Sequence, residues 1–158
     1  MDTRFLSATA LRYADASDSS PAERPTDPSF PLRGVHVLVV DDDAENREAI
    51  QELLEDRGSR ITTAASVSDA LEKFEHEVPD VLLSDIGMPG EDGLDLIRRV
   101  RARPKSLGGA VPAAALTGHT RVEDRHDALC AGFMEHVPKP VDPDELIALV
   151  SSLARMAA

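Results

Sequence analysis

Short apolar runs alternate with longer amphipathic segments along the chain, starting near Gly34. Apolar runs of this kind, bounded by Gly, Pro or charged residues, are typical of strands that are covered on both faces. The fourth run contains Pro112, which lacks a backbone donor, so the start of that strand is expected to be irregular. The five expected strands lie at residues 35–40, 60–65, 80–85, 110–118 and 133–137.

The segments between these runs show helical spacing. After Ser66, which can cap a helix, Val67, Ala70, Leu71 and Phe74 recur at intervals of three and four residues and so share one helical face. Gly58 is placed to end the first helix and Pro104 to stop the third. The five expected helices lie at residues 44–58, after Ser66, at 93–103, at 121–132 and after the capping residue Asp142.

Five strand–helix pairs in succession predict an α/β domain with a parallel sheet and right-handed crossovers. The N-terminal residues 1–33 differ, because four prolines fall between Pro21 and Pro31. Proline fixes its own φ angle and removes a donor, so a flexible N-terminal tail or linker is expected there. The folded domain is therefore expected at residues 34–158.

Composition narrows the possible partners. The 158 residues include 17 Lys and Arg against 29 Asp and Glu, a net charge of −12. Nucleic-acid binding depends on cationic side chains, so this balance argues against it and fits protein or cation partners. No apolar run is long enough to span a membrane, and no secretory signal is evident. With one cysteine, no internal disulfide can form, and a cytoplasmic location is the expectation.

Acidic and polar residues follow the expected strands. Asp41 to Asp43 end the first strand, Asp85 ends the third, Thr117 ends the fourth, and Lys139 follows the fifth. The carboxyl ends of parallel strands meet at one edge, where doubly wound sheets bind their ligands. Clustered carboxylates call for a cation, and an all-oxygen set suits Mg²⁺. The same set could bind a phosphoryl group, with Asp85 as the nucleophile.

The motifs VLVVDDD, LLSDIGMPGEDG, ALTG and HVPKP, between Val35 and Ala154, resemble the receiver domain of bacterial two-component response regulators. The likeness extends to chemotaxis regulators and to the C-terminal receivers of hybrid histidine kinases. It implies a flavodoxin-like doubly wound sheet of strand order 2-1-3-4-5, with residues 34–158 as the receiver domain. It also implies that Asp85 is the phosphoacceptor and that a histidine kinase or phosphotransfer protein supplies the phosphoryl group.

The resemblance assigns roles to the neighbouring residues as well. It implies that Asp42, Asp85 and the backbone carbonyl of Gly87 bind Mg²⁺, with Asp41 acting through a metal-bound water. Thr117 and Lys139 would contact the phosphoryl group. In the family the peptide bond before Pro140 is typically cis. Signalling would run through protein contacts to an unknown target, with self-dephosphorylation and a possible homodimer. No output domain, enzymatic role or other cofactor is expected.

Three positions depart from the family pattern and leave the phosphoryl lifetime and the switch open. Gly87 and His119 stand two residues beyond Asp85 and Thr117, where the family tunes water access to the phosphoryl group. His136 stands where most receivers carry an aromatic switch residue. It could act with Thr117 as the switch, or face the surface without such a role.

Other readings stay open. The chain could be a stand-alone receiver or the receiver module of a larger hybrid histidine kinase. The pattern Asp41-x-Asp43 also occurs in Mg²⁺-dependent phosphohydrolases of the haloacid dehalogenase type, which would use Asp41 as the nucleophile. Glu45 departs from that motif, and no matching late acidic pair is evident. A receiver-like module that works without phosphorylation is the remaining reading.

Two further features are expected to be structural. The basic run 98–103 is interpreted as a solvated helix face. Cys130 is interpreted as a small packing residue. The other histidines, His36, His76, His119 and His126, are not expected to form a metal pair with a cysteine or an acid.

Overall fold

The computed structural model describes residues 29–88, 90–118 and 122–157, with side chains described from residue 126 in the last range. One five-stranded sheet forms the centre, in the order β2-β1-β3-β4-β5 with every neighbouring pair parallel. This confirms the predicted α/β class and strand order. The strands are β1 (His36–Val40), β2 (Arg60–Ala64), β3 (Val81–Asp85), β4 (Ala113–Thr117) and β5 (Glu135–Pro138).

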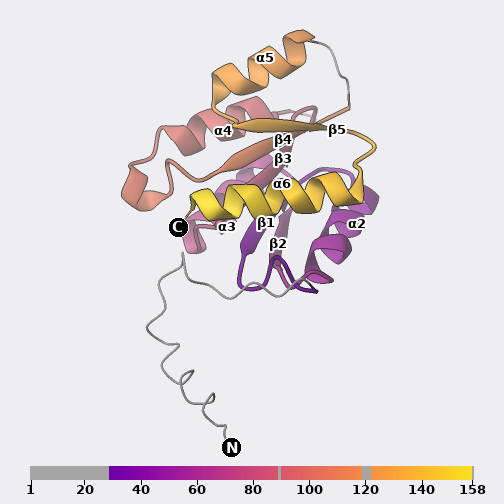
Figure 1. Cartoon of the computed structure of the whole chain (residues 1–158). Coiled ribbons are helices and arrows are strands. Elements are labelled where there is room, and N and C mark those ends of the chain that lie inside the picture. The colour runs from indigo at the N-terminus through magenta and orange to yellow at the C-terminus, as the bar shows by residue number, and fades with distance from the viewer. Residues whose placement is uncertain (1–28, 89, 119–121, 158) are drawn as a thin grey trace, which may run out of the picture.

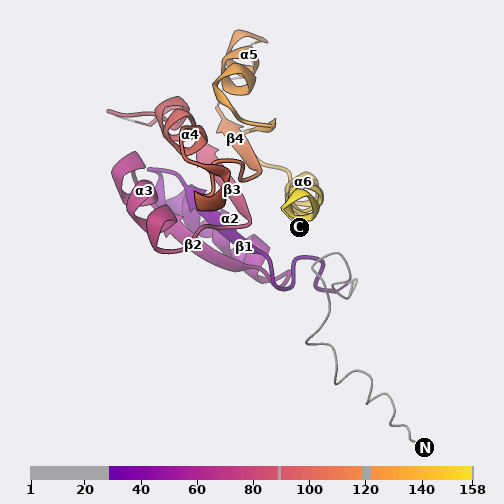
Figure 2. The same ribbon diagram turned by 90° about the vertical axis from the view of Figure 1, so that its left-hand side faces the viewer.

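Helices cover both faces of the sheet (Figure 1). They are α2 (Ala44–Glu55), α3 (Val67–His76), α4 (Gly93–Arg101), α5 (Val122–Ala131) and α6 (Pro143–Met156). One apolar cluster joins the sheet to α3, α4 and α5, and the other joins it to α2 and α6. Figure 2 shows α3 and α4 on one side of the sheet and α6 on the other.

The alternation of side chains along the strands explains the two clusters. In β1, Val37 and Val39 belong to the cluster with α2 and α6, whereas Leu38 and Val40 belong to the cluster with α3 to α5. Successive residues of a strand point to opposite faces, so a strand that is covered on both faces must be apolar throughout. This is why the strands appear in the sequence as continuous apolar runs.

Capping side chains fix where the helices begin. Asp43 accepts hydrogen bonds from the first backbone N–H groups of α2, Ser66 does so for α3, and Asp142 does so for α6. Pro143, with no N–H to satisfy, occupies the start of α6 as predicted. Asp92 and Asp95 form a reciprocal capping pair at α4, which the sequence analysis did not identify.

The connection between α4 and β4 differs from a plain loop. The strand begins at Ala113, directly after Pro112, so the predicted start at residue 110 was three residues too early. A short 3-10 helix, η3 (Lys105–Leu107), was not predicted. It ends at Gly108, whose φ of 91° lies in the left-handed region that glycine favours.

The described chain packs onto the domain a few residues before Gly34. Leu32 is fully buried in the cluster with α2 and α6, and its backbone N–H donates to the carbonyl of Arg57 at 3.0 Å. The tail predicted for residues 1–33 falls mostly on residues 1–28, which lie outside the described residues. Among the described helices, none is long and apolar enough to cross a membrane.

The basic run on α4 and after it is largely ion-paired. Arg98 lies 3.7 Å from Asp95, and Arg99 pairs with Glu91. Arg103 lies 3.6 Å from Glu75. The exposed Arg98 and Arg99 agree with the interpretation as a solvated helix face. Arg103, which also lies over the ring of Phe74, is partly buried, and Arg101 turns inward and is considered below.

Candidate functional site

Three neighbouring strands deliver the candidate residues to one edge of the sheet. β3 lies between β1 and β4, and all three run parallel, so their carboxyl ends lie together. Asp41 follows β1 directly, Asp85 is the last residue of β3, and Thr117 is the last residue of β4. Lys139 follows β5 on the same edge. The topology therefore brings together the residues that the sequence analysis selected.

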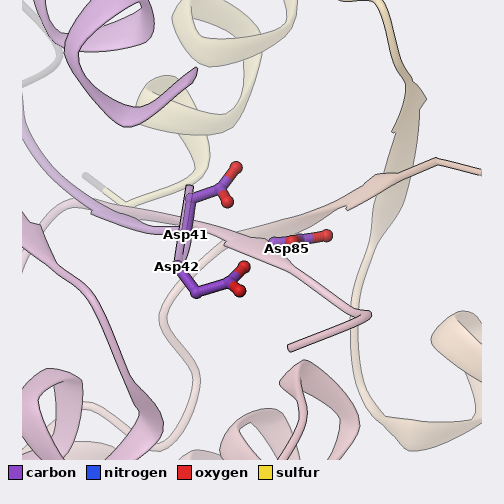
Figure 3. Close-up of side chains that lie close together, drawn as sticks. All are labelled: Asp41, Asp42 and Asp85. Atoms are coloured by element: carbon purple, nitrogen blue, oxygen red, sulfur yellow. The ribbon is translucent and has the colours of Figure 1, made fainter. Parts of the chain in front are cut away.

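Three carboxylates form a cluster that could hold a metal ion. One ligand oxygen from each of Asp41, Asp42 and Asp85 lies within 4.8 Å of the others. Asp41 and Asp85 are buried, whereas Asp42 is exposed. Figure 3 shows their carboxylates gathered in one region. Mg²⁺ prefers oxygen ligands and keeps several of its waters, so a carboxylate cluster with one exposed member fits this ion.

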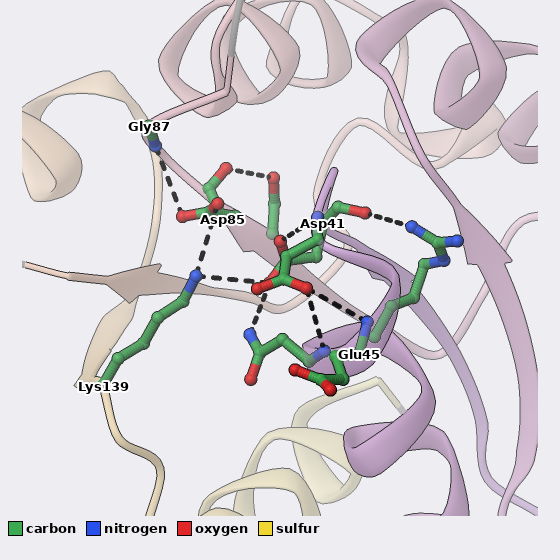
Figure 4. Close-up of polar contacts among 9 residues, drawn as sticks. Asp41, Glu45, Asp85, Gly87 and Lys139 are labelled. Carbon is green, nitrogen blue, oxygen red and sulfur yellow. Dashed lines mark hydrogen bonds and ion pairs between the residues drawn. The ribbon is translucent and has the colours of Figure 1, made fainter.

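Lys139 joins this cluster from the opposite side. Its Nζ lies 3.3 Å from Oδ2 of Asp41 and 3.3 Å from Oδ2 of Asp85 (Figure 4). The Lys139–Pro140 peptide bond is cis, as the resemblance implied. The backbone N–H of Lys139 also donates to the carbonyl of Thr117 at 2.8 Å, so β4 and β5 place these two residues together.

The surroundings of Asp85 and Lys139 shift the pKa values of both side chains. Burial raises the pKa of the Asp85 carboxyl, and the charge of Asp41 raises it further, while Lys139 acts in the opposite direction. Burial alone would lower the pKa of Lys139, but Asp85 and Asp41 outweigh it, so this pKa is raised. The ammonium of Lys139 thus stays charged beside a carboxylate that is costly to ionise.

Two residues on the first turns of α2 hold Asp41 in place, and the sequence analysis did not identify either. The side-chain amide of Asn46 donates to Oδ2 of Asp41 at 2.5 Å, and Arg47 donates to the backbone carbonyl of Asp41 at 2.7 Å. Their spacing, about one helical turn beyond the acids, was the available signal. Asp43 instead caps α2 through Oδ1 and is not a member of the carboxylate cluster.

Two polar atoms near the strand ends are buried without a partner in the described part of the chain. They are Oγ1 of Thr117 and Nδ1 of His136. A buried hydroxyl without a partner is costly, so the hydrogen-bonding capacity of Thr117 is unused in this structure. The backbone N–H of Gly87 donates to Oδ1 of Asp85 at 3.3 Å. His119 lies outside the described residues.

The chain thus has a doubly wound parallel sheet with three carboxylates and a lysine at its carboxyl edge. Residues 37–151 match the family described as the response regulator receiver domain. The chain therefore belongs to the receiver domain family of response regulators.

Curated relatives agree with this assignment. The chain is 48% identical over 119 residues to an uncharacterized 14.6 kDa protein of Leptolyngbya boryana, covering 75% of this chain and 89% of that protein. It is 39% identical over 118 residues to the DNA-binding transcriptional regulator NtrC of Escherichia coli K12, covering 75% of this chain but 24% of NtrC. For the transcriptional regulatory protein PhoP of Escherichia coli K12, identity is 34% over 121 residues, covering 77% of this chain and 52% of PhoP.

Solved structures show the same fold. The chemotaxis protein CheY4 of Vibrio cholerae superposes with a TM-score of 0.71 at 29% identity, over 75% of this chain and 98% of CheY4. The receiver domain of the Francisella response regulator 1452 gives a TM-score of 0.71 at 27% identity, over 79% of this chain and all (100%) of that domain.

Proposed function

We propose that this receiver domain accepts a phosphoryl group on Asp85 from a histidine kinase or a phosphotransfer protein. One observation carries the proposal: the Lys139 ammonium lies 3.3 Å from Asp85, in a cluster whose third carboxylate, Asp42, is exposed. A partly open carboxylate beside a fixed cation is what phosphoryl transfer needs, because positioning and charge neutralisation supply most of the catalysis.

The chemistry is an in-line displacement. A carboxylate oxygen of Asp85 attacks the phosphorus atom, and the bond from phosphorus to the donor's imidazole nitrogen breaks. The imidazole keeps the bonding electron pair, and the new oxygen–phosphorus bond makes an acyl phosphate. The Lys139 ammonium lies where it can balance charge on the phosphoryl oxygens. Hydrolysis of the acyl phosphate by water then resets the domain.

The carboxylates fit a divalent cation. In this proposal Asp42, Asp85 and the backbone carbonyl of Gly87 hold Mg²⁺, and Asp41 acts through a bound water. When bound, the ion neutralises negative charge on the transferred group. The side chain of Asn46, through its hydrogen bond to Asp41, keeps that carboxylate oriented toward the site.

Asp85 is a better acceptor than Asp41, the residue that a haloacid dehalogenase-type phosphohydrolase would use. The Asp41 side chain has no exposed surface, whereas that of Asp85 is 9% exposed. Asp41 also accepts hydrogen bonds at both oxygens, from Asp43 at one and from Asn46 and Lys139 at the other. A carboxylate so fully bound is poorly placed to attack phosphorus.

Phosphorylation in this proposal changes a surface of α5, β5 and α6. Thr117, whose hydroxyl has no partner among the described residues, turns toward the phosphoryl oxygens. The His136 ring on β5 then fills the space that Thr117 leaves. The altered surface selects a protein partner, either for a stand-alone receiver or within a larger hybrid histidine kinase.

The proposal is tested by intact-protein mass spectrometry after incubation with acetyl phosphate and Mg²⁺. Wild type should gain one phosphoryl group, and the gain should vanish in Asp85→Asn or when a chelator removes Mg²⁺. Asp43→Asn is a matched control, because Asn caps helices as well as Asp and Asp43 is outside the cluster.

The possible contrary results are distinct. An adduct that persists in Asp85→Asn and disappears in Asp41→Asn would replace the proposal with the phosphohydrolase reading. No adduct on wild type, even in samples quenched within milliseconds, would indicate a module that works without phosphorylation.

A further inference from the structure

Oδ2 of Asp41 is bound by two donors at once, and they differ in how closely they hold it. The side-chain amide of Asn46 donates to this oxygen at 2.5 Å, and the ammonium of Lys139 donates at 3.3 Å. A charge-assisted bond from an ammonium is usually about 2.8 Å long, so Lys139 lies further from the oxygen than its charge would favour. Asn46 is therefore the close partner of Oδ2, and Lys139 is the distant one.

Lys139 is held loosely because two carboxylates share it. Its Nζ also lies 3.3 Å from Oδ2 of Asp85 (Figure 4), and its side chain is 24% exposed. The ammonium thus stands between Asp41 and Asp85 without a close contact to either. A small movement toward Asp85 breaks one long contact with Asp41 and no short one.

Asp41 tolerates the loss of a partner less well than an exposed acid does. Its side chain has no exposed surface, so water cannot simply replace a donor that leaves. Oδ1 accepts from the backbone N–H of Asp43 at 2.9 Å, which does not depend on Lys139. A buried charged oxygen without a donor is costly, so the state of Oδ2 after Lys139 leaves depends on Asn46.

The start of α2 keeps Asn46 at this position. Oδ1 of Asp43 caps the helix by accepting from its first backbone N–H groups, that of Asn46 among them. Arg47, the next residue, donates to the backbone carbonyl of Asp41 at 2.7 Å. These contacts join the helix to Asp41 without Lys139, so the amide can stay in place when the ammonium moves.

We propose that Asn46 is a positioning residue that frees Lys139 for the phosphoryl group. The inference rests on the proposed function, phosphorylation of Asp85. When the phosphoryl group arrives, the ammonium exchanges its contact with Asp41 for one with a phosphoryl oxygen, and no proton is transferred. The amide of Asn46 remains on Oδ2, so the buried carboxylate keeps a donor on each oxygen. Without the amide, the same movement leaves Oδ2 without a donor.

The first test is a double-mutant cycle on stability, which requires no phosphorylation. Asn46→Leu keeps the approximate size of the side chain and removes its donor, and Lys139→Met removes the ammonium. Urea unfolding without Mg²⁺ gives the unfolding equilibrium constants of wild type, both single variants and the double variant. Because the two donors can replace one another, Asn46→Leu should raise this constant about tenfold more in the Lys139→Met chain than in wild type.

The second test separates metal binding from phosphoryl transfer. In the resting chain Asp43 and Lys139 still hold Asp41, so Asn46→Leu should leave the affinity for Mg²⁺, measured by calorimetry, nearly unchanged. At saturating Mg²⁺ the rate of phosphorylation by acetyl phosphate should fall about 10- to 100-fold, because Lys139 then leaves an oxygen without a donor. If Asn46 only oriented Asp41 toward the metal, the affinity itself would fall about 10- to 100-fold.

Gln51→Leu is the matched control. Gln51 is another amide of α2, and its side chain binds Glu55 rather than Asp41. This change should be additive with Lys139→Met in the unfolding cycle and should leave the phosphorylation rate unchanged. Asn46→Ala is a second variant, chosen because alanine favours helices. It should behave as Asn46→Leu does, since the amide rather than the packing of the side chain is responsible.

Two results would overturn the inference. The first is an additive cycle, in which Asn46→Leu changes the unfolding constant equally with and without Lys139. The second is a loss of Mg²⁺ affinity as large as the loss of phosphorylation rate, which would make Asn46 an orienting residue for the metal site alone. A wild type that gains no phosphoryl group would contradict the proposed function instead, and the unfolding cycle would still decide whether the two donors share Oδ2.

Discussion

At the scale of single residues, Asp85 is held in an environment that makes its ionisation costly. Burial raises the pKa of its carboxyl, so ionisation costs more in the folded chain than in the unfolded one. The resulting penalty is absent below the unfolded pKa, grows as pH rises toward the folded pKa, and is fully present above the folded pKa. Functional sites often carry such a cost.

Replacing this carboxylate should therefore stabilise the protein. Asp85→Asn is expected to raise the free energy of unfolding at pH 7, without Mg²⁺, by an amount on the order of 1 kcal/mol, the size typical of stabilising substitutions. Urea unfolding of wild type and variant gives the difference directly, and it should shrink as pH falls. Asp42→Asn, at an exposed carboxylate of the same cluster, is the control and should change stability less. A destabilised Asp85→Asn would contradict the reading of this site.

His36 is a second buried ionisable residue. It lies at the start of β1, the opposite end of the strand from the carboxylate cluster. Nε2 of the ring lies 2.8 Å from Oγ1 of Thr62. Burial lowers the pKa of His36, and Arg60 lowers it further, while Glu77 and Asp80 oppose the change. The unfolded chain therefore binds a proton more readily. The contribution of neutral His36 to stability is present above its unfolded pKa and is lost as pH falls toward the folded pKa.

The predicted consequence is a pH-dependent stability that a substitution removes. Between about pH 7.5 and 5.5, a range that spans the unperturbed histidine pKa of about 6.5, wild type should lose more unfolding free energy than His36→Gln. Urea midpoints at several pH values measure this, with the exposed His76→Gln as control. Equal pH slopes for wild type and His36→Gln would show that the buried ring does not titrate as described.

At the scale of elements, Arg101 connects the end of α4 to two connecting segments. Its Nε donates to the carbonyl of Gly132 at 3.0 Å, and its Nη1 donates to the carbonyls of Gly109 and Val111 at 3.0 and 2.7 Å. Burial lowers the pKa of this guanidinium. One side chain thus joins α4 to the start of β4 and to the α5–β5 turn.

A side chain with fewer hydrogen-bond donors than Arg101 should hold these segments less firmly to α4. Arg101→Lys is expected to destabilise the fold by about 1–3 kcal/mol, because an ammonium cannot reproduce the fork of the guanidinium and leaves buried carbonyls unpaired. Arg99→Lys, on the exposed face of the same helix, should change stability by less than about 0.5 kcal/mol. Unfolding in guanidinium chloride measures the stability of the two variants. Equal losses of unfolding free energy would contradict the structural role of Arg101.

The same element shows what sequence patterns reveal and what they miss. The strands and helices were predictable because apolar positions recur with the period that each structure requires. The inward turn of Arg101 was not, because a run of arginines reads as one exposed face until the carbonyls opposite it are known. The helix η3 was missed for a related reason, since its three residues carry no periodicity.

At the scale of the whole molecule, the charged residues of the candidate site could be predicted from the sequence. The residues that hold them in place could not. Asp85 ends its strand and Lys139 follows its strand, and the carboxyl ends of parallel strands share one edge, so their meeting there could be predicted. The contacts of Asn46 and Arg47 with Asp41 depend on how α2 leaves β1, and their spacing from the acids is too weak a signal to give that geometry. Cys130 was interpreted as a small packing residue, but it is exposed on α5, so that interpretation was wrong.

The carboxylate cluster also predicts how the whole domain responds to a divalent cation. Mg²⁺ that binds the folded chain alone should stabilise it, by about 1.4 kcal/mol at a concentration ten times the dissociation constant. Thermal unfolding with and without Mg²⁺ measures this, and Asp85→Asn should reduce the shift. An identical shift in that variant would place Mg²⁺ binding elsewhere.

The central claim, that Asp85 carries the phosphoryl group, is tested most directly by chemical mapping. Borohydride reduces an aspartyl phosphate to homoserine, and trypsin then separates the two candidate acids. Asp41 falls in the peptide 34–47 and Asp85 in the peptide 74–98. After treatment with acetyl phosphate and Mg²⁺, we predict homoserine at position 85 of the second peptide. Homoserine at position 41 would contradict the account.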